Sequence, residues 1–113
     1  MIRKYGKTAK ANKYHNKHTV VDDMAFDSKR EAAVYTELKL LRFAGEIENI
    51  KCQVPYPMVL NGIKICDYYA DFVVRYKGAD KDTVIDAKGV RTQVYRLKKK
   101  MMKAFYNIDI VER

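Results

Sequence analysis

An aspartate and a lysine lie two positions apart within the apolar run "VIDAKG", residues 84–89. Residues i and i+2 of a β-strand point to the same face, so Asp86 and Lys88 should emerge side by side. Such a pair either neutralises itself as a simple ion pair or forms part of an active site. The two residues alone do not decide between these alternatives.

Two more carboxylates fall where the surrounding pattern is apolar. Glu31 precedes Val34 by three residues and Leu38 by seven, which places it on the apolar stripe of a predicted helix. Asp71 stands inside the strand-like run "YYADFVV", where an ionised carboxylate is costly unless a cation or strong donors meet it. Glu31 could instead act only as the capping-box acid behind Ser28, and Asp71 could pair with an arginine.

Three carboxylates against one lysine would leave excess negative charge in the predicted core. A hard divalent cation with oxygen ligands would balance this charge, and Mg²⁺ usually binds one or two carboxylates together with phosphate oxygens. The pattern therefore predicts a magnesium site built from Glu31, Asp71 and Asp86 beside Lys88.

The basic residues concentrate in two zones of a chain whose formal net charge is +9. Residues 1–20 carry six Lys/Arg residues and residues 88–103 carry seven, and neither zone contains an acid. Two basic zones around a mildly acidic middle predict binding to a polyanion, although a lysine-rich solvated surface would look the same.

The composition narrows the class of protein. A chain of 113 residues with 48% hydrophobic residues predicts a basic arm over residues 1–20 and a single globular domain over 21–113. The apolar runs are too short to cross a membrane, and the first residues do not resemble a signal peptide, so we expect a soluble cytoplasmic protein. Cys52 and Cys66 lack the spacing of a zinc site, and His15 and His18 lack a second ligand pair.

The elements that must position these residues can be read from local patterns. Ser28 as N-cap and Ala44-Gly45 as the stop predict a helix of about 16 residues, with Val34 and Leu38 on its buried face. Only a short extended piece is expected before it. Asn61-Gly62 predicts a type I′ hairpin turn.

The strands lie between two predicted helices. "VLNGIKI" should contribute two strands, "YYADFVVRY" a third and "TVIDAKG" a fourth, with Pro55 and Pro57 placing the first at a sheet edge. A second helix should follow from Thr92, and "NIDIVE" should close as a strand. The expected buried face of this second helix contains the apolar residues Val94, Leu97, Met101, Ala104 and Phe105. The predicted fold is α/β, a small mixed β-sheet flanked by helices in the order α-β-β-β-α-β.

Glu31, Asp71 and the Asp86-Ala87-Lys88 run, followed by a basic helix, resemble the active-site pattern of the PD-(D/E)xK nuclease superfamily. "FDSKREAAVYTELKLLRFAGEI", "YYADFVV" and "IDAKGVRTQVYRLKKKMM" are more closely similar to small phage-encoded nucleases described as Holliday-junction-resolvase-like. The resemblance covers roughly residues 20–112, and one departure is the absence of a proline before Asp71. It implies a restriction-endonuclease-like core.

The resemblance also implies roles for individual residues. Asp71 and Asp86 would hold Mg²⁺, or Mn²⁺ in its place, with the Ala87 carbonyl as a further ligand, and Glu31 would complete the site or position a water. Lys88 would orient the attacking water, and Gln53 would support the site by hydrogen bonding. The nucleic acid would contact two sets of residues, which are Lys4, Lys7, Lys10, Lys13 and Lys17 in the arm, and Arg91, Thr92, Gln93, Tyr95, Arg96, Lys98, Lys99, Lys100 and Lys103 near the second helix.

Three functions are compatible with these residues. The leading hypothesis is a metal-dependent DNA endonuclease that cuts branched DNA as a homodimer, in the cytoplasm of the host cell if the chain is phage-encoded. A nicking or restriction-like nuclease on linear duplex would use the same chemistry. A non-catalytic DNA-binding protein would use the basic zones without needing the carboxylates to converge.

Overall fold

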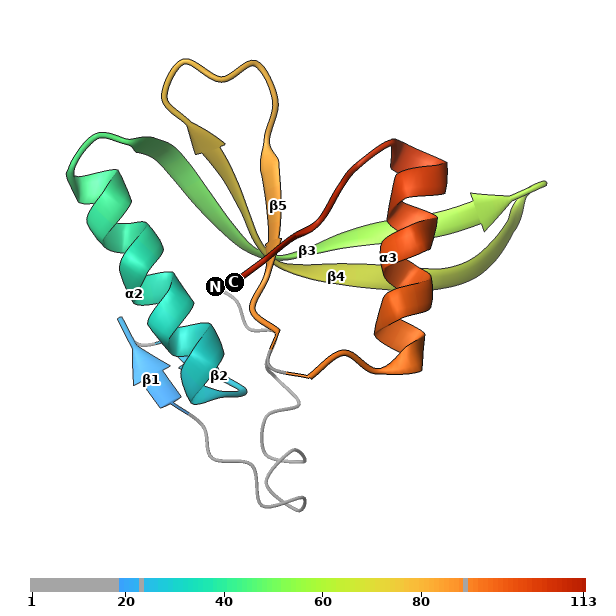
Figure 1. The fold of residues 1–113 in the computed structure, drawn as a ribbon, viewed down its shortest axis with the longest axis horizontal. Coiled ribbons are helices and arrows are strands. Elements are labelled where there is room, and N and C mark those ends of the chain that lie inside the picture. The colour runs from blue at the N-terminus through green and yellow to red at the C-terminus, as the bar shows by residue number, and fades with distance from the viewer. Residues whose placement is uncertain (1–18, 23, 89) are drawn as a thin grey trace.

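The computed structural model describes residues 19–22, 24–88 and 90–113. The predicted contacts of Lys4, Lys7, Lys10, Lys13 and Lys17 lie outside the described residues. The described chain is a small α/β protein with two helices and a mixed sheet, as predicted. Its elements are β1 (Thr19–Val21), β2 (Met24–Phe26), α2 (Lys29–Phe43), β3 (Ile47–Leu60), β4 (Ile63–Tyr76), β5 (Thr83–Asp86), α3 (Gln93–Tyr106) and β6 (Val111–Glu112) (Figure 1).

Helix α2 begins and ends at the predicted residues. The Ser28 side chain accepts a hydrogen bond from the Glu31 backbone N–H at 3.1 Å, which satisfies a donor of the first turn. At the other end Gly45 has a φ of +84°, and the next residue, Glu46, donates to the Leu41 carbonyl at 2.8 Å. This is the Schellman arrangement that glycine permits because it lacks a Cβ.

The four-stranded sheet has the order β3-β4-β5-β6. Strands β3, β4 and β5 pair antiparallel, and β6 pairs parallel to β5. Asn61 and Gly62 both have positive φ, as the predicted type I′ turn between β3 and β4 requires. Pro55 and Pro57 lie in the edge strand β3, which was also predicted.

Two predictions about strands were wrong. Residues 63–76 form one continuous strand rather than two, because Cys66 and Asp67 continue the pairing with Met58 and Pro57 of β3. The piece before α2 is a separate two-stranded hairpin, β1-β2, whose turn includes Asp22 at a φ of 54°. The segment contains no glycine or asparagine, and its turn signal is the weaker Asp22-Asp23 pair.

The long β3-β4 hairpin bends where Gln53 adopts a left-handed backbone with a φ of 52°. The pairing register is unchanged across this point, since Cys52 pairs with Phe72 and Val54 pairs with Ala70. However, Cys52 and Phe72 pack in the hydrophobic cluster under α2, whereas Val54 and Ala70 pack in the cluster under α3. Figure 1 shows both strands changing direction near the middle of the molecule. One hairpin therefore supplies the core beneath both helices.

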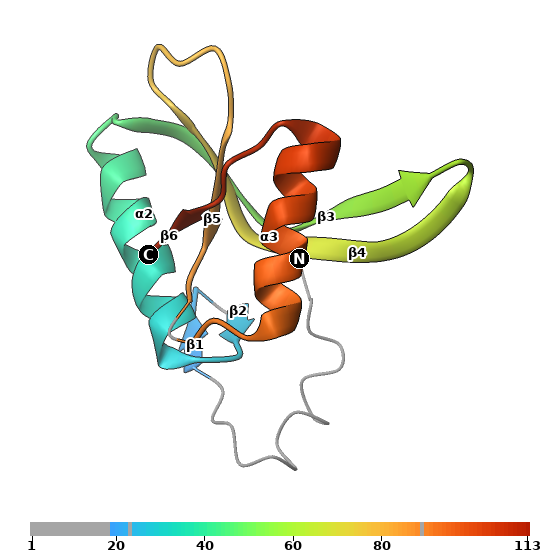
Figure 2. The ribbon, with the colours of Figure 1, turned by 45° about the vertical axis from the view of Figure 1, so that its right-hand side comes forward.

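The two helices cover opposite faces of the β4-β5 pair. Phe72 and its partner Ile85 belong to the cluster that contains the buried residues of α2. Val73 and its partner Val84, one residue along each strand, belong to the cluster that contains Met102 of α3. Because adjacent strand residues point to opposite faces, the sheet separates the helices, and Figure 2 shows β5 and β6 between them.

The prediction for the buried face of α3 was wrong in part. Met101 and Phe105 pack against the core as predicted, but Val94, Leu97 and Ala104 are exposed. Val94 is 62% exposed and Leu97 is 58% exposed, whereas Tyr95 and Met102 are buried. The helix carries two apolar stripes at helical spacing, and the stripe with Tyr95 is the one that meets Val73 and the rest of its cluster.

Among the described residues, no helix is long and apolar enough to cross a membrane.

Candidate functional site

Glu31 and Asp71 are joined by one amide side chain at the bend of the hairpin. The Gln53 Nε2 donates to Glu31 Oε2 at 3.2 Å and to Asp71 Oδ1 at 3.0 Å. Glu31 lies in the first turn of α2 and is only 5% exposed, so its carboxylate points toward the sheet as predicted. The Gln53 amide gives each carboxylate a hydrogen-bond donor, which reduces the cost of burying them.

Asp71 also contacts the residue that follows β5. Its Oδ2 accepts a hydrogen bond from the Ala87 backbone N–H at 2.9 Å. Phe72 pairs with Ile85, so continuing the register by one residue sets Asp71 opposite Asp86. Opposed residues of antiparallel strands share a face, and the two aspartates therefore lie on the same side of the sheet. The Ala87 N–H thus has an observed contact with Asp71, whereas the Ala87 carbonyl stays a predicted metal ligand.

Asp86 is 3% exposed and is held by Tyr68, a residue that the sequence reasoning missed. The Tyr68 hydroxyl donates to Asp86 Oδ2 at 2.6 Å. Burial, together with this hydrogen bond and the negative charge of Asp86, raises the pKa of Tyr68 far above its ordinary value, so the hydroxyl keeps its proton. The "YYAD" run contained the residue, but only the bend of the hairpin brings its hydroxyl to Asp86.

The second oxygen of Asp86 faces Lys88. Asp86 Oδ1 is buried and accepts no hydrogen bond from the described residues, and Lys88 Nζ lies 3.3 Å away as an ion pair. The same ammonium lies 4.4 Å from the ring centroid of Tyr95, a distance typical of a cation–π contact. Lys88 lies two residues past the end of β5 rather than within the strand, but it emerges beside Asp86 as predicted.

Tyr95 and Thr92, two of the predicted DNA contacts, also make contacts within the protein. Tyr95 is 6% exposed, and its hydroxyl donates to Glu112 Oε2 at 2.8 Å. The Thr92 side chain caps α3 by accepting a hydrogen bond from the Tyr95 backbone N–H at 3.1 Å. Both side chains thus hold α3 in place. Thr92 is nevertheless exposed, and the DNA contacts of both residues stay predictions. Gln93 is exposed.

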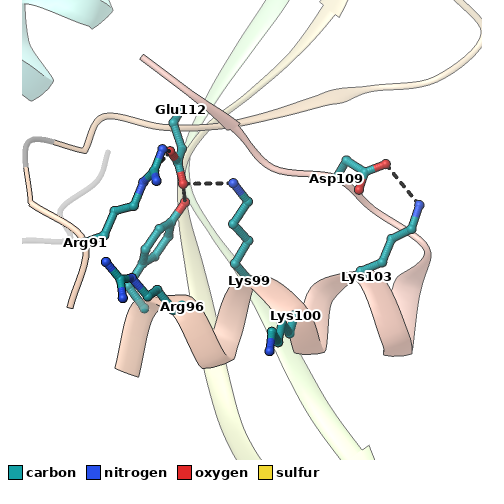
Figure 3. A pocket seen from close by; sticks show the side chains of 8 residues that line it. Arg91, Arg96, Lys99, Lys100, Lys103, Asp109 and Glu112 are labelled. Atoms are coloured by element: carbon teal, nitrogen blue, oxygen red, sulfur yellow. Dashed lines mark hydrogen bonds and ion pairs between the residues drawn. The ribbon is translucent and has the colours of Figure 1, made fainter. Parts of the chain in front are cut away.

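Glu112 of β6 connects α3 to the segment that carries Lys88. Arg91 approaches Glu112 Oε1 at 2.5 Å, and Lys99 approaches Oε2 at 2.9 Å (Figure 3). Hydrogen bonds from Lys99, Tyr95 and Arg91 lower the pKa of the Glu112 carboxyl from 4.5 to about 2. Glu112 was not predicted as a site residue, because one acid in a short final strand is not a distinctive pattern.

The remaining predicted DNA contacts differ in how they are paired. Lys103 approaches Asp109 at 3.0 Å, so its charge is partly compensated. Within the described part of the chain, Arg96 and Lys100 have no carboxylate partner, and in Figure 3 both point away from Glu112. Lys98 is half-buried.

A divalent cation would need several oxygen ligands close together. Among residues 19–22, 24–88 and 90–113, no group of three or more His, Cys, Asp and Glu side chains could hold a metal ion. A three-carboxylate site thus stays a prediction. Two opposed aspartates, one with a buried oxygen that accepts no hydrogen bond, fit a smaller protein contribution to an Mg²⁺ site.

Replacing Tyr68 by Phe should lower the free energy of unfolding by about 2 kcal/mol, because a buried carboxylate loses a hydrogen bond. Denaturant unfolding measures the change. Tyr69→Phe is the matched control, since Tyr69 is the next residue but is 54% exposed, and we expect a change within about 0.5 kcal/mol. Equal losses in the two variants would contradict the role of the Tyr68 hydroxyl.

The pKa of Glu112 predicts how stability changes with pH. Since the carboxyl pKa is lower in the folded state, its contribution is complete above about pH 4.5 and is lost as pH falls toward 2. Glu112→Gln should therefore cost about 1–2 kcal/mol at pH 7 and much less near pH 2. Unfolding curves at both pH values measure this, with exposed Glu48→Gln as control. A difference independent of pH would overturn the assignment.

The comparisons with known proteins give a family but no function. No curated protein and no solved structure matches the chain. A family described as "Protein of unknown function (DUF1064)" matches residues 11–111, a range that includes Glu31, Asp71, Asp86 and Lys88. The chain belongs to this family of unknown function, DUF1064.

Proposed function

We propose that the chain is a metal-dependent DNA endonuclease of the PD-(D/E)xK type, with a restriction-endonuclease-like core. The observation that carries the proposal is the opposition of Asp71 and Asp86 at the hairpin bend, with Lys88 Nζ 3.3 Å from Asp86 Oδ1. Half-buried Asp71 and buried Asp86, with a lysine beside them, are the groups that phosphodiester hydrolysis with a divalent cation needs.

Asp71 and Asp86 would hold Mg²⁺, or Mn²⁺ in its place, and the Ala87 carbonyl is a further candidate ligand. When bound, the cation would stabilise negative charge on the phosphate and lower the pKa of a coordinated water. Mg²⁺ commonly uses one or two carboxylates and takes its other oxygens from water and phosphate. The proposal therefore does not depend on Glu31 being a direct ligand.

The other residues of the site would position a water and the carboxylates and would offset negative charge on the phosphate. Lys88, held between Asp86 and the Tyr95 ring, would offset the charge that builds on the scissile phosphate. Glu31 would position a water with its carboxylate, and Gln53 would fix the spacing of Glu31 and Asp71 through its two hydrogen bonds. Each role uses a contact that is present before any substrate binds.

We further propose that the substrate is branched DNA and that the active form is a homodimer. Resolving a four-way junction requires two cuts related by near two-fold symmetry, and each chain offers one candidate site. The junction preference derives from the sequence resemblance. The exposed apolar residues Val94 and Leu97 on α3 support a dimer, because they leave an apolar stripe available for a second copy.

A non-catalytic DNA-binding protein is the second candidate. It is favoured by the lack, in the described part of the chain, of three acidic, His or Cys side chains that could hold a metal ion. Such a protein would keep the basic surface of α3 and would use the Asp86–Lys88 pair only for stability. The two candidates differ in what happens when the charge of Asp86 is removed.

Asp86→Asn should lower cleavage at least about a hundredfold, on the scale of losing one electrostatic catalytic element, while DNA binding is kept. The asparagine retains an oxygen that can accept the Tyr68 hydrogen bond, and half-buried Lys88 can turn toward solvent, so we expect the variant to fold. Cleavage of a four-way junction, a flap and a linear duplex with Mg²⁺ should be measured beside gel-shift binding and thermal melting. Asp67→Asn is the control, since Asp67 lies on the neighbouring strand β4 and pairs with exposed Lys64.

The outcomes separate the candidates. A folded, binding and inactive Asp86→Asn protein beside an active Asp67→Asn protein supports the nuclease. An Asp86→Asn protein that unfolds and loses binding indicates a structural ion pair, because breaking a buried pair costs roughly 3–5 kcal/mol. If the unaltered chain binds all three substrates and cuts none with Mg²⁺ or Mn²⁺, the non-catalytic candidate replaces the proposal.

A further inference from the structure

A basic cavity of about 480 Å³ opens beside the candidate site. Its walls come from the first turn of α2, the segment after β5, the first turn of α3 and the end of the chain. Both views in Figures 1 and 2 show α2 and α3 beginning at the same end of the molecule, which explains how residues from distant segments meet here. The lining residues are Arg30, Lys88, Arg91, Arg96, Glu112 and Arg113.

The charges of this cavity are unbalanced. It has five cationic side chains and one carboxylate, Glu112, which already pairs with Arg91 and, from outside the cavity, with Lys99. Lys88 pairs with Asp86, and Arg113 pairs with Glu37 at 3.3 Å. Arg30 donates its Nε to a main-chain oxygen of Arg113 at 2.9 Å and makes no ion pair with a carboxylate side chain of the described residues. Arg96 has no carboxylate partner in the described part of the chain. Two arginines from different helices thus line one cavity with charge available for an anion.

The cavity is connected to the candidate site and to the surface of α3. Lys88 lines the cavity and also pairs with Asp86, so an anion held there lies next to the carboxylates. A second cavity of about 380 Å³ shares Arg91, Arg96 and Glu112 with the first and continues along α3 past Lys99, Lys100 and Lys103 (Figure 3). The basic surface is therefore a continuous track rather than a single pocket.

We propose that this track binds the sugar–phosphate backbone of a DNA strand next to the scissile phosphate, with Arg30 and Arg96 holding one phosphate group between α2 and α3. The inference rests on the proposed function for the position of the cut, and it adds where the strand lies. It also adds Arg30 and Arg113 to the DNA surface, two residues that the sequence did not identify. A planar guanidinium with several donors suits phosphate recognition.

The length of the track fits a polymer better than a small anion. The seven residue steps from Arg96 to Lys103 rise about 10 Å along the helix, which corresponds to roughly three base steps of about 3.4 Å. A single inorganic phosphate would contact only one of the two cavities. A DNA strand would contact both, and each neutralised phosphate would add to the salt dependence of binding.

The test measures binding without metal, so that it does not depend on cleavage. A labelled duplex of about 20 base pairs should be titrated with the protein in a chelator at several salt concentrations, for unaltered protein, Arg30→Gln and Arg96→Gln. Each variant should weaken binding about five- to tenfold near 0.1 M salt and reduce the log–log salt slope by about 1. Arg42→Gln is the matched control, because it removes one positive charge from the last turn of the same helix α2, away from the cavity.

Arg30→Lys guards against a folding defect, since it keeps the charge but changes the hydrogen bond to Arg113. It should keep the salt slope of the unaltered protein, and thermal melting should show that all variants fold. If Arg30→Gln and Arg96→Gln lose no more affinity than Arg42→Gln, the track assignment is wrong, whatever Asp86→Asn does to cleavage. If the two variants lose binding selectively but no chain cuts DNA, the track stands and the nuclease proposal fails.

Discussion

The bend of the β3-β4 hairpin at Gln53 is the constraint on which the rest of the structure depends. A non-glycine residue with positive φ costs of order 1–3 kcal/mol and persists only where its surroundings hold it. Here the side chain of the same residue bridges Glu31 and Asp71, so the strained backbone and the carboxylate contacts stabilise each other. The bend also passes the hairpin from the cluster under α2 to the cluster under α3.

The carboxylates near the bend are stabilised mainly by hydrogen-bond donors rather than by many ion pairs. Asp71 accepts from Gln53 and from the Ala87 N–H, and Asp86 accepts from the Tyr68 hydroxyl. Each of these donors lies on, or directly after, a strand of the same sheet, which fixes the carboxylates relative to one another. Outside this group, Glu112 holds α3 through Arg91, Tyr95 and Lys99. The Tyr95 ring then lies against Lys88, so the position of α3 and the surroundings of the lysine are coupled.

Helix ends and turns, which depend on local residues, could be predicted from the sequence. Contacts that depend on tertiary packing could not. Ser28, Gly45 and Asn61-Gly62 act through their own backbone, so the helix ends and the hairpin turn could be read directly. The apolar setting of Glu31 and Asp86 likewise revealed that both carboxylates would be buried. The buried face of α3 could not be read, because Val94 and Tyr95 begin two stripes of similar spacing and only the sheet chooses between them. The contact of Tyr68 with Asp86 could not be read either, since no local signal announces a positive φ at Gln53.

The central claim is that the opposed aspartates at the bend bind a divalent cation, and Mn²⁺ titration of ¹⁵N-labelled protein tests it most directly. A paramagnetic ion broadens nearby amide signals, and the cation site needs no substrate to form. We predict that the signals of Asp71, Asp86 and Ala87 broaden first and that excess Mg²⁺ restores them. Broadening that begins instead at the exposed loop acids Asp80 and Asp82, or broadening without any site preference, would contradict the account.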